Sequence, residues 1–285
     1  MSPSLAKRLL VAAVGIPAAF GLVYVGGWVL AALLAGLGAL GAMELYRLAS
    51  RGGVRPLVAV GVAGALAAPL AAFAARPGGG LETRWTLLSA AVWLIGIMLL
   101  AVRERRPGER PLSAVSVTAF GALYAGGLPA FLLWLRHGAV SRSAWAATWL
   151  VFLPLALTWI SDTLAMIGGS LVGGAKLAPV LSPKKTWAGA VAGAVAAPLL
   201  APLYGRWVLG AVGIEVPVVA LVLVGLGVGI LGQLGDLAES LFKREAGVKD
   251  SGGFFPGHGG VLDRLDSLYW GIPVTVVVLK AFGAI

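Results

Sequence analysis

The sequence predicts an all-α, polytopic integral membrane protein with about nine transmembrane helices in a single membrane domain. Two observations carry this prediction. The chain of 285 residues is 59% hydrophobic and only 12% charged, whereas a soluble domain carries about 25% charged residues. Its apolar residues also fall into runs of about 20, the length that crosses a bilayer as a helix. A chain this apolar has too little polar surface to cover a water-facing globule, so we expect it in a membrane.

The apolar runs give the expected helices in order. They are 9–25, 27–46, 57–75, 85–102, 112–135, 144–168, 187–205, 215–242 and 267–285. The first run follows Lys7 and Arg8, as the apolar part of a signal peptide would. It lacks a small-residue cleavage site and leads directly into a second run, which favours a membrane helix.

The basic residues predict the topology. They gather before residue 9 and in the alternate loops 47–55, 103–110, 176–185 and 243–264. Because cytoplasmic loops carry the excess of Lys and Arg, we expect a cytoplasmic N-terminus, an outer C-terminus and location in the cell (inner) membrane. The net charge of +10 then reflects topology and contact with anionic lipid headgroups, and no nucleic-acid partner is expected. The chain has no cysteine, which excludes disulfides and thiolate metal sites.

Residues 1–143 contain few polar side chains within the runs, and we interpret them as a scaffold. Glu44 and Arg47 stand three apart at the end of a run, which is typical of an interfacial ion pair. Residues 144–285 differ, because Asp162 lies inside a run and Asp236 lies near the end of another. A carboxylate at the centre of a membrane helix costs about 2.5–3.5 kcal/mol, so it usually faces a cavity or a partner. The alternative is that these carboxylates are helix-end charges that reach the headgroups.

A polar stripe predicts a cation site. Asp236, Glu239, Ser240 and Lys243 stand at i, i+3, i+4 and i+7 and share one helix face. Asp263 and Asp266 are three apart where the last run begins, so two helix ends that carry carboxylates are joined by a short loop. Mg²⁺ usually takes one or two carboxylates and fills its other positions with water and substrate phosphate. We therefore expect the carboxylates to converge on Mg²⁺, and a second cation is physically plausible.

The loop between these helix ends predicts phosphate binding. Gly259 and Gly260 let the backbone approach an anion closely. Positive charge and hydrogen-bond donors surround them, and a flexible glycine hinge is the alternative. The donors are Lys243, Arg244, Lys249, His258 and Arg264. The segment 181–189 adds Ser182, Lys184, Lys185 and Thr186 before a run; these residues anchor a helix to headgroups or, beside a metal, hold a triphosphate.

The run SLFKREAGVKDSGGFFPGHGGVLDRLD, residues 240–266, resembles the signature of the bacterial phosphatidate cytidylyltransferases (CDP-diacylglycerol synthases) at each specified position. SDT at 161–163, KLAP at 176–179 and SPKKTW at 182–187 agree with that family in order and spacing. The resemblance covers roughly residues 155–285. Ala188 stands where the family commonly has an acidic residue, and Gly174 and Ala175 stand near a position that is commonly basic.

The resemblance implies Mg²⁺-dependent transfer of a cytidylyl group from CTP to phosphatidic acid, with CDP-diacylglycerol and pyrophosphate as products. Carried over residue by residue, it implies metal ligation by Asp236 and Asp263, with Asp162 and Asp266 as further candidates, and phosphate contacts by Lys243, Arg244, Lys249 and His258. It also suggests that the protein contacts membrane lipids and forms a homodimer. The alternatives are another lipid nucleotidyl- or phosphotransferase and an ion-coupled transporter, which would place carboxylates at mid-span.

Overall fold

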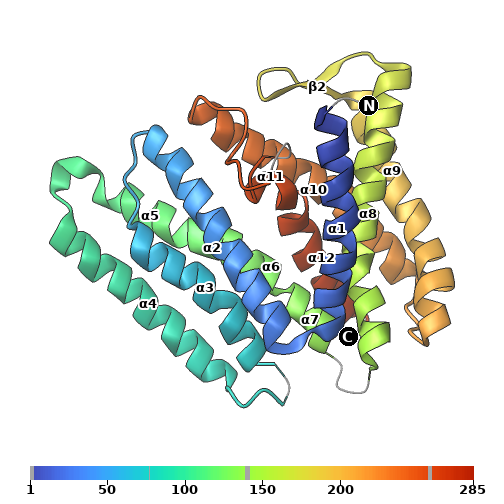
Figure 1. Cartoon of the computed structure of the whole chain (residues 1–285), viewed down its shortest axis with the longest axis horizontal. Coiled ribbons are helices and arrows are strands. Elements are labelled where there is room, and N and C mark those ends of the chain that lie inside the picture. Colours follow the sequence, from blue (N-terminus) through green and yellow to red (C-terminus); the bar gives the residue numbers. More distant parts are fainter. Residues whose placement is uncertain (1–2, 77, 139–141, 256–258) are drawn as a thin grey trace. The chain divides into compact units, whose positions relative to one another are not determined.

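The computed structural model describes residues 3–76, 78–138, 142–255 and 259–285, without the side chains of residues 3–12, 14 and 83. Its chain forms two compact units, each made of two stretches. The first combines Met1–Leu133 with Phe242–Arg264, and the second combines Trp134–Leu241 with Leu265–Ile285. Figure 1 follows the helices of both units along the chain.

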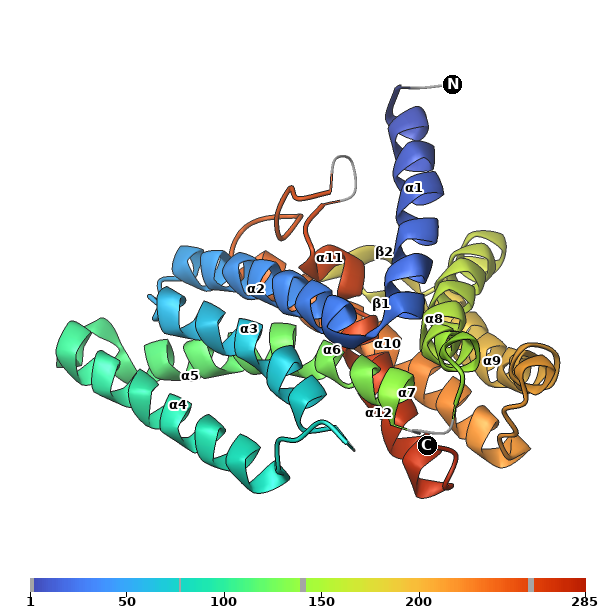
Figure 2. The ribbon, with the colours of Figure 1, turned by 60° about the horizontal axis from the view of Figure 1, so that its bottom comes forward.

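The first unit is built from helices that pack side by side through small residues. It contains α1 (Pro3–Val25), α2 (Gly27–Arg51), α3 (Val58–Ala74), α4 (Thr83–Glu104), the 3₁₀ turn Pro107–Glu109, α5 (Pro111–Ala122), the π-helical turn Leu123–Gly127, α6 (Leu128–Ala130) and the start of α7 (Leu132–His137). A Cβ at Gly38 of α2 would lie 2.9 Å from Cα of Gly126. Such close backbone approach is how membrane helices pack, and Figure 2 shows α2, α3 and α5 as neighbours.

Tyr46 fixes α2 within this unit. Its side chain is 1% exposed and packs between Gly61 of α3 and Gly121 of α5, where any Cβ would overlap the ring. The Tyr46 hydroxyl donates a hydrogen bond of 2.7 Å to the carbonyl of Thr118. The segment around residue 46 is therefore held from two sides by neighbouring helices.

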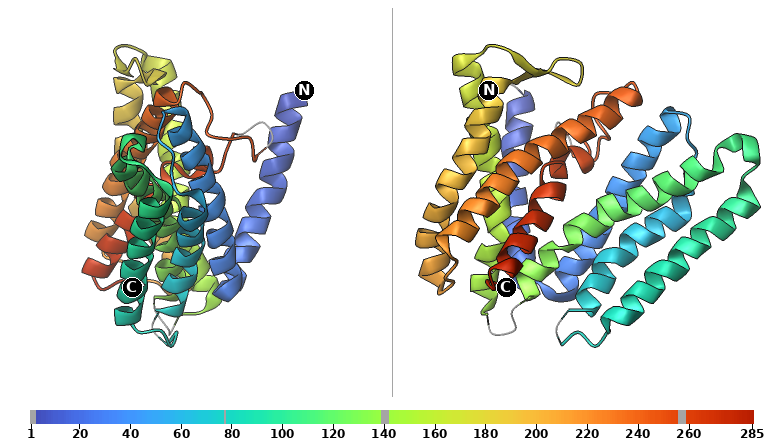
Figure 3. Two further views of the ribbon diagram at one scale, coloured as in Figure 1. Left: turned by 90° about the vertical axis from the view of Figure 1, so that its left-hand side faces the viewer. Right: turned by 180° about the vertical axis from the view of Figure 1, so that it is seen from behind.

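The second unit contains α8 (Ala144–Val172), the strands β1 (Lys176–Ala178) and β2 (Ser182–Thr186), α9 (Trp187–Tyr204), the turns Gly205–Leu209 and Gly210–Val212, and α12 (Leu268–Ala281). α10 (Val218–Glu245) belongs to this unit up to Leu241, and α11 (Leu262–Leu265) ends in it. β1 and β2 pair antiparallel, with Lys176 opposite Thr186, and the hairpin projects from the ends of α8 and α9 (Figure 3, right).

Small residues also join α8 to α9. A Cβ at Gly189 would lie 2.6 Å from the carbonyl oxygen of Ala165, and one at Gly193 would lie 2.9 Å from that of Ser161. The two helices are therefore in near backbone contact on either side of Asp162. This contact fixes the start of α9, and with it β2, against the middle of α8.

The predicted helical class is confirmed, and the protein is a helical membrane protein. Among the described residues, six helical segments are long and apolar enough to cross a membrane: Gly27–Arg51, Arg84–Glu104, Pro111–His137, Ala144–Val172, Trp187–Val212 and Val218–Glu245. Gly15–Val25 and Val58–Ala74 are shorter apolar helices. The run 112–135 is helical but contains a π turn just before Pro129, whose missing N–H interrupts regular helix hydrogen bonding. The β1–β2 hairpin was not predicted.

Candidate functional site

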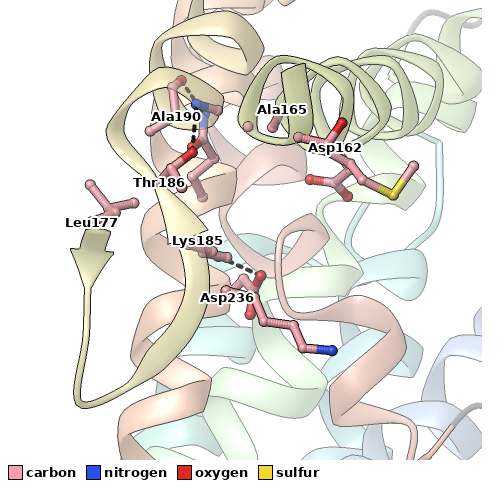
Figure 4. Close-up of a pocket in the computed structure, with 13 residues that line it drawn as sticks. Asp162, Ala165, Leu177, Lys185, Thr186, Ala190 and Asp236 are labelled. Atoms are coloured by element: carbon pink, nitrogen blue, oxygen red, sulfur yellow. Dashed lines mark hydrogen bonds and ion pairs between the residues drawn. The ribbon is translucent and has the colours of Figure 1, made fainter. Parts of the chain in front are cut away.

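A pocket of about 400 Å³ opens in the second unit between the hairpin and helices α8, α9 and α10. Figure 4 shows Asp162 on α8, Lys185 and Thr186 on β2 and Asp236 on α10 around it. Lys184, Ser170 and Gln233 add further polar groups, while Ala165, Met166, Leu177 and Ala190 make an apolar wall. The structure thus brings together Asp162, Asp236 and the lysines of SPKKTW, which lie far apart in the sequence.

The hairpin reaches the pocket because Thr186 caps α9. Its backbone is extended, and its Oγ1 accepts a hydrogen bond of 3.1 Å from the N–H of Gly189. This N-cap satisfies one of the free N–H groups at the start of the helix. The Thr186 hydroxyl, predicted as a substrate ligand, therefore also has a local structural partner. Lys185 directly before the cap is turned toward α10.

The charged groups that line this pocket are one ion pair, a second lysine (Lys184) and a second carboxylate (Asp162). Nζ of Lys185 lies 2.5 Å from Oδ2 of Asp236, and Asp162 faces the same space from α8 (Figure 4). Nε2 of Gln233, one turn before Asp236, donates to the carbonyl oxygens of Ala190 and Gly229, at 3.0 and 2.7 Å, and so ties α10 to α9. The position of the Asp236 carboxylate is therefore set by the packing of α10 on α9.

The donor set of this pocket fits Mg²⁺. Two carboxylates from different helices face one water-accessible space, which is the number that Mg²⁺ usually takes from a protein. Among the described residues, three or more His, Asp or Glu side chains do not gather as a ready-made metal cage. Water and substrate phosphate would have to complete the coordination shell.

Residues of the segment 243–264, which we call the signature loop, form a second polar cluster in the first unit. Its centre is Asp263 on α11, whose side chain is 7% exposed. Oδ1 of Asp263 accepts a hydrogen bond of 2.7 Å from Nζ of Lys243. Oδ2 lies within 2.9 Å of the N–H and hydroxyl of Ser251 and of the N–H of Gly260. Burial alone would raise the pKa of Asp263, but the hydrogen bonds from Lys243, Gly260 and Ser251 lower it to about 2.

Glu44 of α2 completes this cluster, and its interpretation as an interfacial partner of Arg47 is wrong. The residue is 4% exposed. Its carboxylate accepts hydrogen bonds from the N–H groups of Val261 and Leu262, both at 3.0 Å, and lies 2.9 Å from Oγ of Ser251. Figure 2 shows the start of α11 beside α2. One signal of this role is visible in the sequence, because Glu44 lies among the apolar residues of GAMELY.

The remaining predicted residues have mixed surroundings. Gly259 adopts φ +83°, and its carbonyl accepts a 2.9 Å hydrogen bond from Phe255. Arg244 donates to the carbonyl of Val248, and Oδ1 of Asp266 accepts from the N–H of Ser267. Lys249 and Arg264 are exposed, Ser182 is half-buried and Ser240 is buried.

His258 lies outside the described residues. Asp236 and Asp263 belong to different units, so their convergence on one cation stays a prediction.

The fold and these clusters define a helical membrane protein that gathers carboxylates and lysines, the side chains that bind metal cations and phosphate groups. Residues 6–282 match the profile of the cytidylyltransferase family, and the chain belongs to that family. It is 40% identical over 202 residues to a phosphatidate cytidylyltransferase of Brucella abortus, covering 71% of this chain and 67% of the relative. It is 32% identical over 291 residues to one of Synechocystis sp., covering 94% of each chain. The family resemblance drawn from the signature run is confirmed.

Proposed function

We propose that the protein transfers the cytidylyl group of CTP to phosphatidic acid, forming CDP-diacylglycerol and pyrophosphate. The observation that carries this proposal is the pocket in which Asp162 and Asp236 face Lys184 and Lys185. Membership of the cytidylyltransferase family and the relatives named phosphatidate cytidylyltransferase support the same activity.

The chemistry needs little from a general base. The phosphate of phosphatidic acid is a monoester with a second pKa of about 6, so it is largely dianionic at pH 7. One of its oxygens attacks the α-phosphorus of CTP, and the bond from that phosphorus to the oxygen bridging the β-phosphorus breaks as pyrophosphate leaves. The protein must bring two polyanions together and neutralise charge on the leaving group.

The residues of the pocket match these tasks. Asp162 and Asp236 would hold Mg²⁺, which neutralises phosphate charge when bound. Lys184 and Lys185 bind the phosphate chain, and Lys185 exchanges Asp236 for a phosphate oxygen as the nucleotide enters. Ala165, Met166 and Leu177 form the apolar part of the pocket wall beside these groups.

The signature loop is proposed to supply further phosphate ligands, namely Lys243, Arg244, Lys249, His258 and Arg264, with the backbone of Gly259 and Gly260. Ser182, Thr186 and Ser240 are proposed to donate hydroxyl hydrogen bonds. Metal ligation by Asp263 and a catalytic role for Asp266 stay predictions of the resemblance. A cation on Oδ1 of Asp263 would have to replace the ammonium of Lys243, which now lies 2.7 Å away.

Radiolabelled CTP provides the test of the reaction. With phosphatidic acid, label at the α-phosphate should enter the lipid phase, and label at the γ-phosphate should leave as pyrophosphate. EDTA should stop both events and Mg²⁺ should restore them. A lipid that takes up the γ-label would instead identify a phosphotransferase, and activity indifferent to EDTA would rule out the metal.

The proposed topology has nine spans, a cytoplasmic N-terminus and an inner-membrane location, with residues 176–186 and 243–264 on the side where CTP is found. The chain has no cysteine, so single cysteines at the exposed residues Asp250 and Glu215 report sidedness without background. A membrane-impermeant maleimide should label position 215 in intact cells and position 250 only after permeabilisation. The opposite pattern would overturn the topology.

A homodimer is also proposed, and the mass of the protein in detergent tests it.

A further inference from the structure

We propose that Glu44, in the N-terminal half of the chain, is a positioning residue for the signature loop: it holds the loop at two places, Ser251 and Val261–Leu262, in one fixed arrangement. The expected effect of Glu44 on catalysis rests on the proposed function. The geometry of Glu44 is independent of that function.

The hydrogen bonds of Glu44 join positions that are ten residues apart in the loop. Oε1 accepts from the N–H of Val261, and Oε2 accepts from the N–H of Leu262, both at 3.0 Å. Oε2 also lies 2.9 Å from Oγ of Ser251, ten residues before Val261. These N–H groups lie at the start of α11. That helix is too short for its dipole alone to bind an anion, and the buried carboxylate of Glu44 accepts the hydrogen bonds of its free N–H groups.

Two glycines show that the loop is shaped around this carboxylate. The three atoms nearest to a Cβ at Gly252 would all belong to the Glu44 side chain, and a Cβ at Gly260 would overlap both Glu44 oxygens and the Ser251 hydroxyl. Neither glycine has a positive φ, so close approach to Glu44 is the reason for the missing side chain. At Gly253, by contrast, a Cβ would meet nothing within 4 Å.

Ser251 connects Glu44 to the charged part of the loop. Its Oγ is 2.9 Å from Oε2 of Glu44 and 2.9 Å from Oδ2 of Asp263, and it is 7% exposed. A hydroxyl has one proton, so it donates to one of these carboxylates at a time. Asp263 in turn binds Nζ of Lys243. A chain of contacts therefore runs from Glu44 through Ser251 and Asp263 to Lys243, the cation predicted to meet substrate phosphate.

The first experiment replaces Glu44 with Gln. The shape is retained, but the amide nitrogen of Gln must face the N–H of either Val261 or Leu262, so at least one hydrogen bond is lost. Hydrogen–deuterium exchange in peptides covering 248–262 should become faster, while peptides from α8 and the β1–β2 hairpin should be unchanged. Loss of a charged hydrogen bond corresponds to roughly a ten- to hundredfold decrease in kcat. Glu104→Gln, at a half-exposed glutamate of α4, is the matched control and should change neither quantity.

The second experiment uses the glycines and needs no substrate. Gly252→Ala should accelerate exchange in the loop, whereas Gly253→Ala should leave it unchanged. The Glu44→Ala substitution removes the three atoms nearest to a Cβ at residue 252, so Gly252→Ala should add little to the effect of Glu44→Ala. A residue of general structural importance would give additive effects instead.

The outcomes separate the inference from the proposed function. Unchanged loop exchange in Glu44→Gln, or equal effects of Gly252→Ala and Gly253→Ala, would overturn the positioning role whatever the activity. A wild-type protein that makes no CDP-diacylglycerol would overturn the proposed function but leave the exchange results to decide on Glu44.

Discussion

Lys185 of β2 and Asp236 of α10 form an ion pair, Nζ to Oδ2 at 2.5 Å, inside the pocket of the second unit (Figure 4). The side chains are 26% and 32% exposed, so neither is sealed from incoming ligands. An ammonium that holds a carboxylate in this way prevents both charges from lying unpaired in an apolar surrounding. Binding of a nucleotide with its cation would replace this pair by two new ones, lysine with phosphate and aspartate with metal.

Removal of either pocket carboxylate should stop turnover. Asp236→Asn and Asp162→Asn each take away a charge that the cation needs with little change in shape, and we expect kcat to fall by about a hundredfold or more. The Mg²⁺ concentration for half-maximal activity should rise in both variants. Glu215→Gln, at an exposed carboxylate outside the pocket, should behave as wild type. Normal Mg²⁺ dependence in Asp162→Asn would remove that residue from the metal site.

Lys185→Met should act chiefly on nucleotide binding. It keeps most of the length of the side chain and removes the charge, so the apparent KM for CTP should increase about ten- to a hundredfold. Lys176→Met on the paired strand β1 is the control, because Lys176 does not line the pocket and should leave the KM near the wild-type value. Equal effects of the two substitutions would mean that the overall charge of the hairpin matters, and not the contact made by Lys185.

The signature loop should loosen at low pH. The pKa of Asp263 is lowered to about 2, against about 3.9 in an unfolded chain. Its ionised form therefore stabilises the folded loop fully above about pH 5, and this contribution is lost as the pH falls from about 4 through 2. The anisotropy of a fluorophore on a cysteine at position 250 should fall over that range.

The variant Lys243→Met shows whether Asp263 is the group that titrates. Without the ammonium the pKa of Asp263 is higher, so the decrease in anisotropy should move to higher pH. A fluorophore at position 215, in the second unit, serves as the control for global unfolding. If the midpoint stays where it was after Lys243→Met, another group controls the loop.

Gly259 should tolerate no side chain. Its φ of +83° already disfavours other residues, and a Cβ there would lie 2.6 Å from Oδ2 of Asp263. Gly247 has a φ of +67°, but a Cβ added there would meet nothing within 4 Å. Gly247→Ala therefore measures the cost of the backbone conformation alone. Gly259→Ala should lower the thermal midpoint and activity more than Gly247→Ala, and Gly259→Val more still. Equal losses of thermal midpoint and activity in the two alanine variants would show that the Asp263 side chain moves away from the new Cβ without cost.

Hydropathy predicted the helices well because burial in lipid selects for long apolar runs whatever the contacts between them. The end of each run was less predictable, as in α10, where the helix continues through Lys243 to Glu245. The β1–β2 hairpin was not predicted, because its strands of three and five residues are too short to show an alternation of apolar and polar residues.

The site was partly predictable for a related reason. Asp162 and Asp236 were predicted because charge is rare in these runs, and Lys185 because it stands with Lys184 just before a run. The three residues share a pocket. Glu44 also stood out, but its spacing from Arg47 offered a simple local partner. Its true partners are backbone N–H groups more than 200 positions away, and a sequence pattern carries no information about backbone donors. Gly260 was predicted to let the backbone approach an anion, whereas the contact of Gly252 and Gly260 with the Glu44 carboxylate has no counterpart in the sequence pattern.

The Glu44 contact also has a consequence for biogenesis. Residues 44 and 261 are separated by 217 positions, so Glu44 is translated and inserted long before Val261 and Leu262 leave the ribosome. Until then the carboxylate has none of these partners, and the loop cannot take its final form. A nascent chain that is released early therefore has its N-terminal spans but not the assembled signature loop, so a truncated chain in the membrane would be inactive instead of partly active.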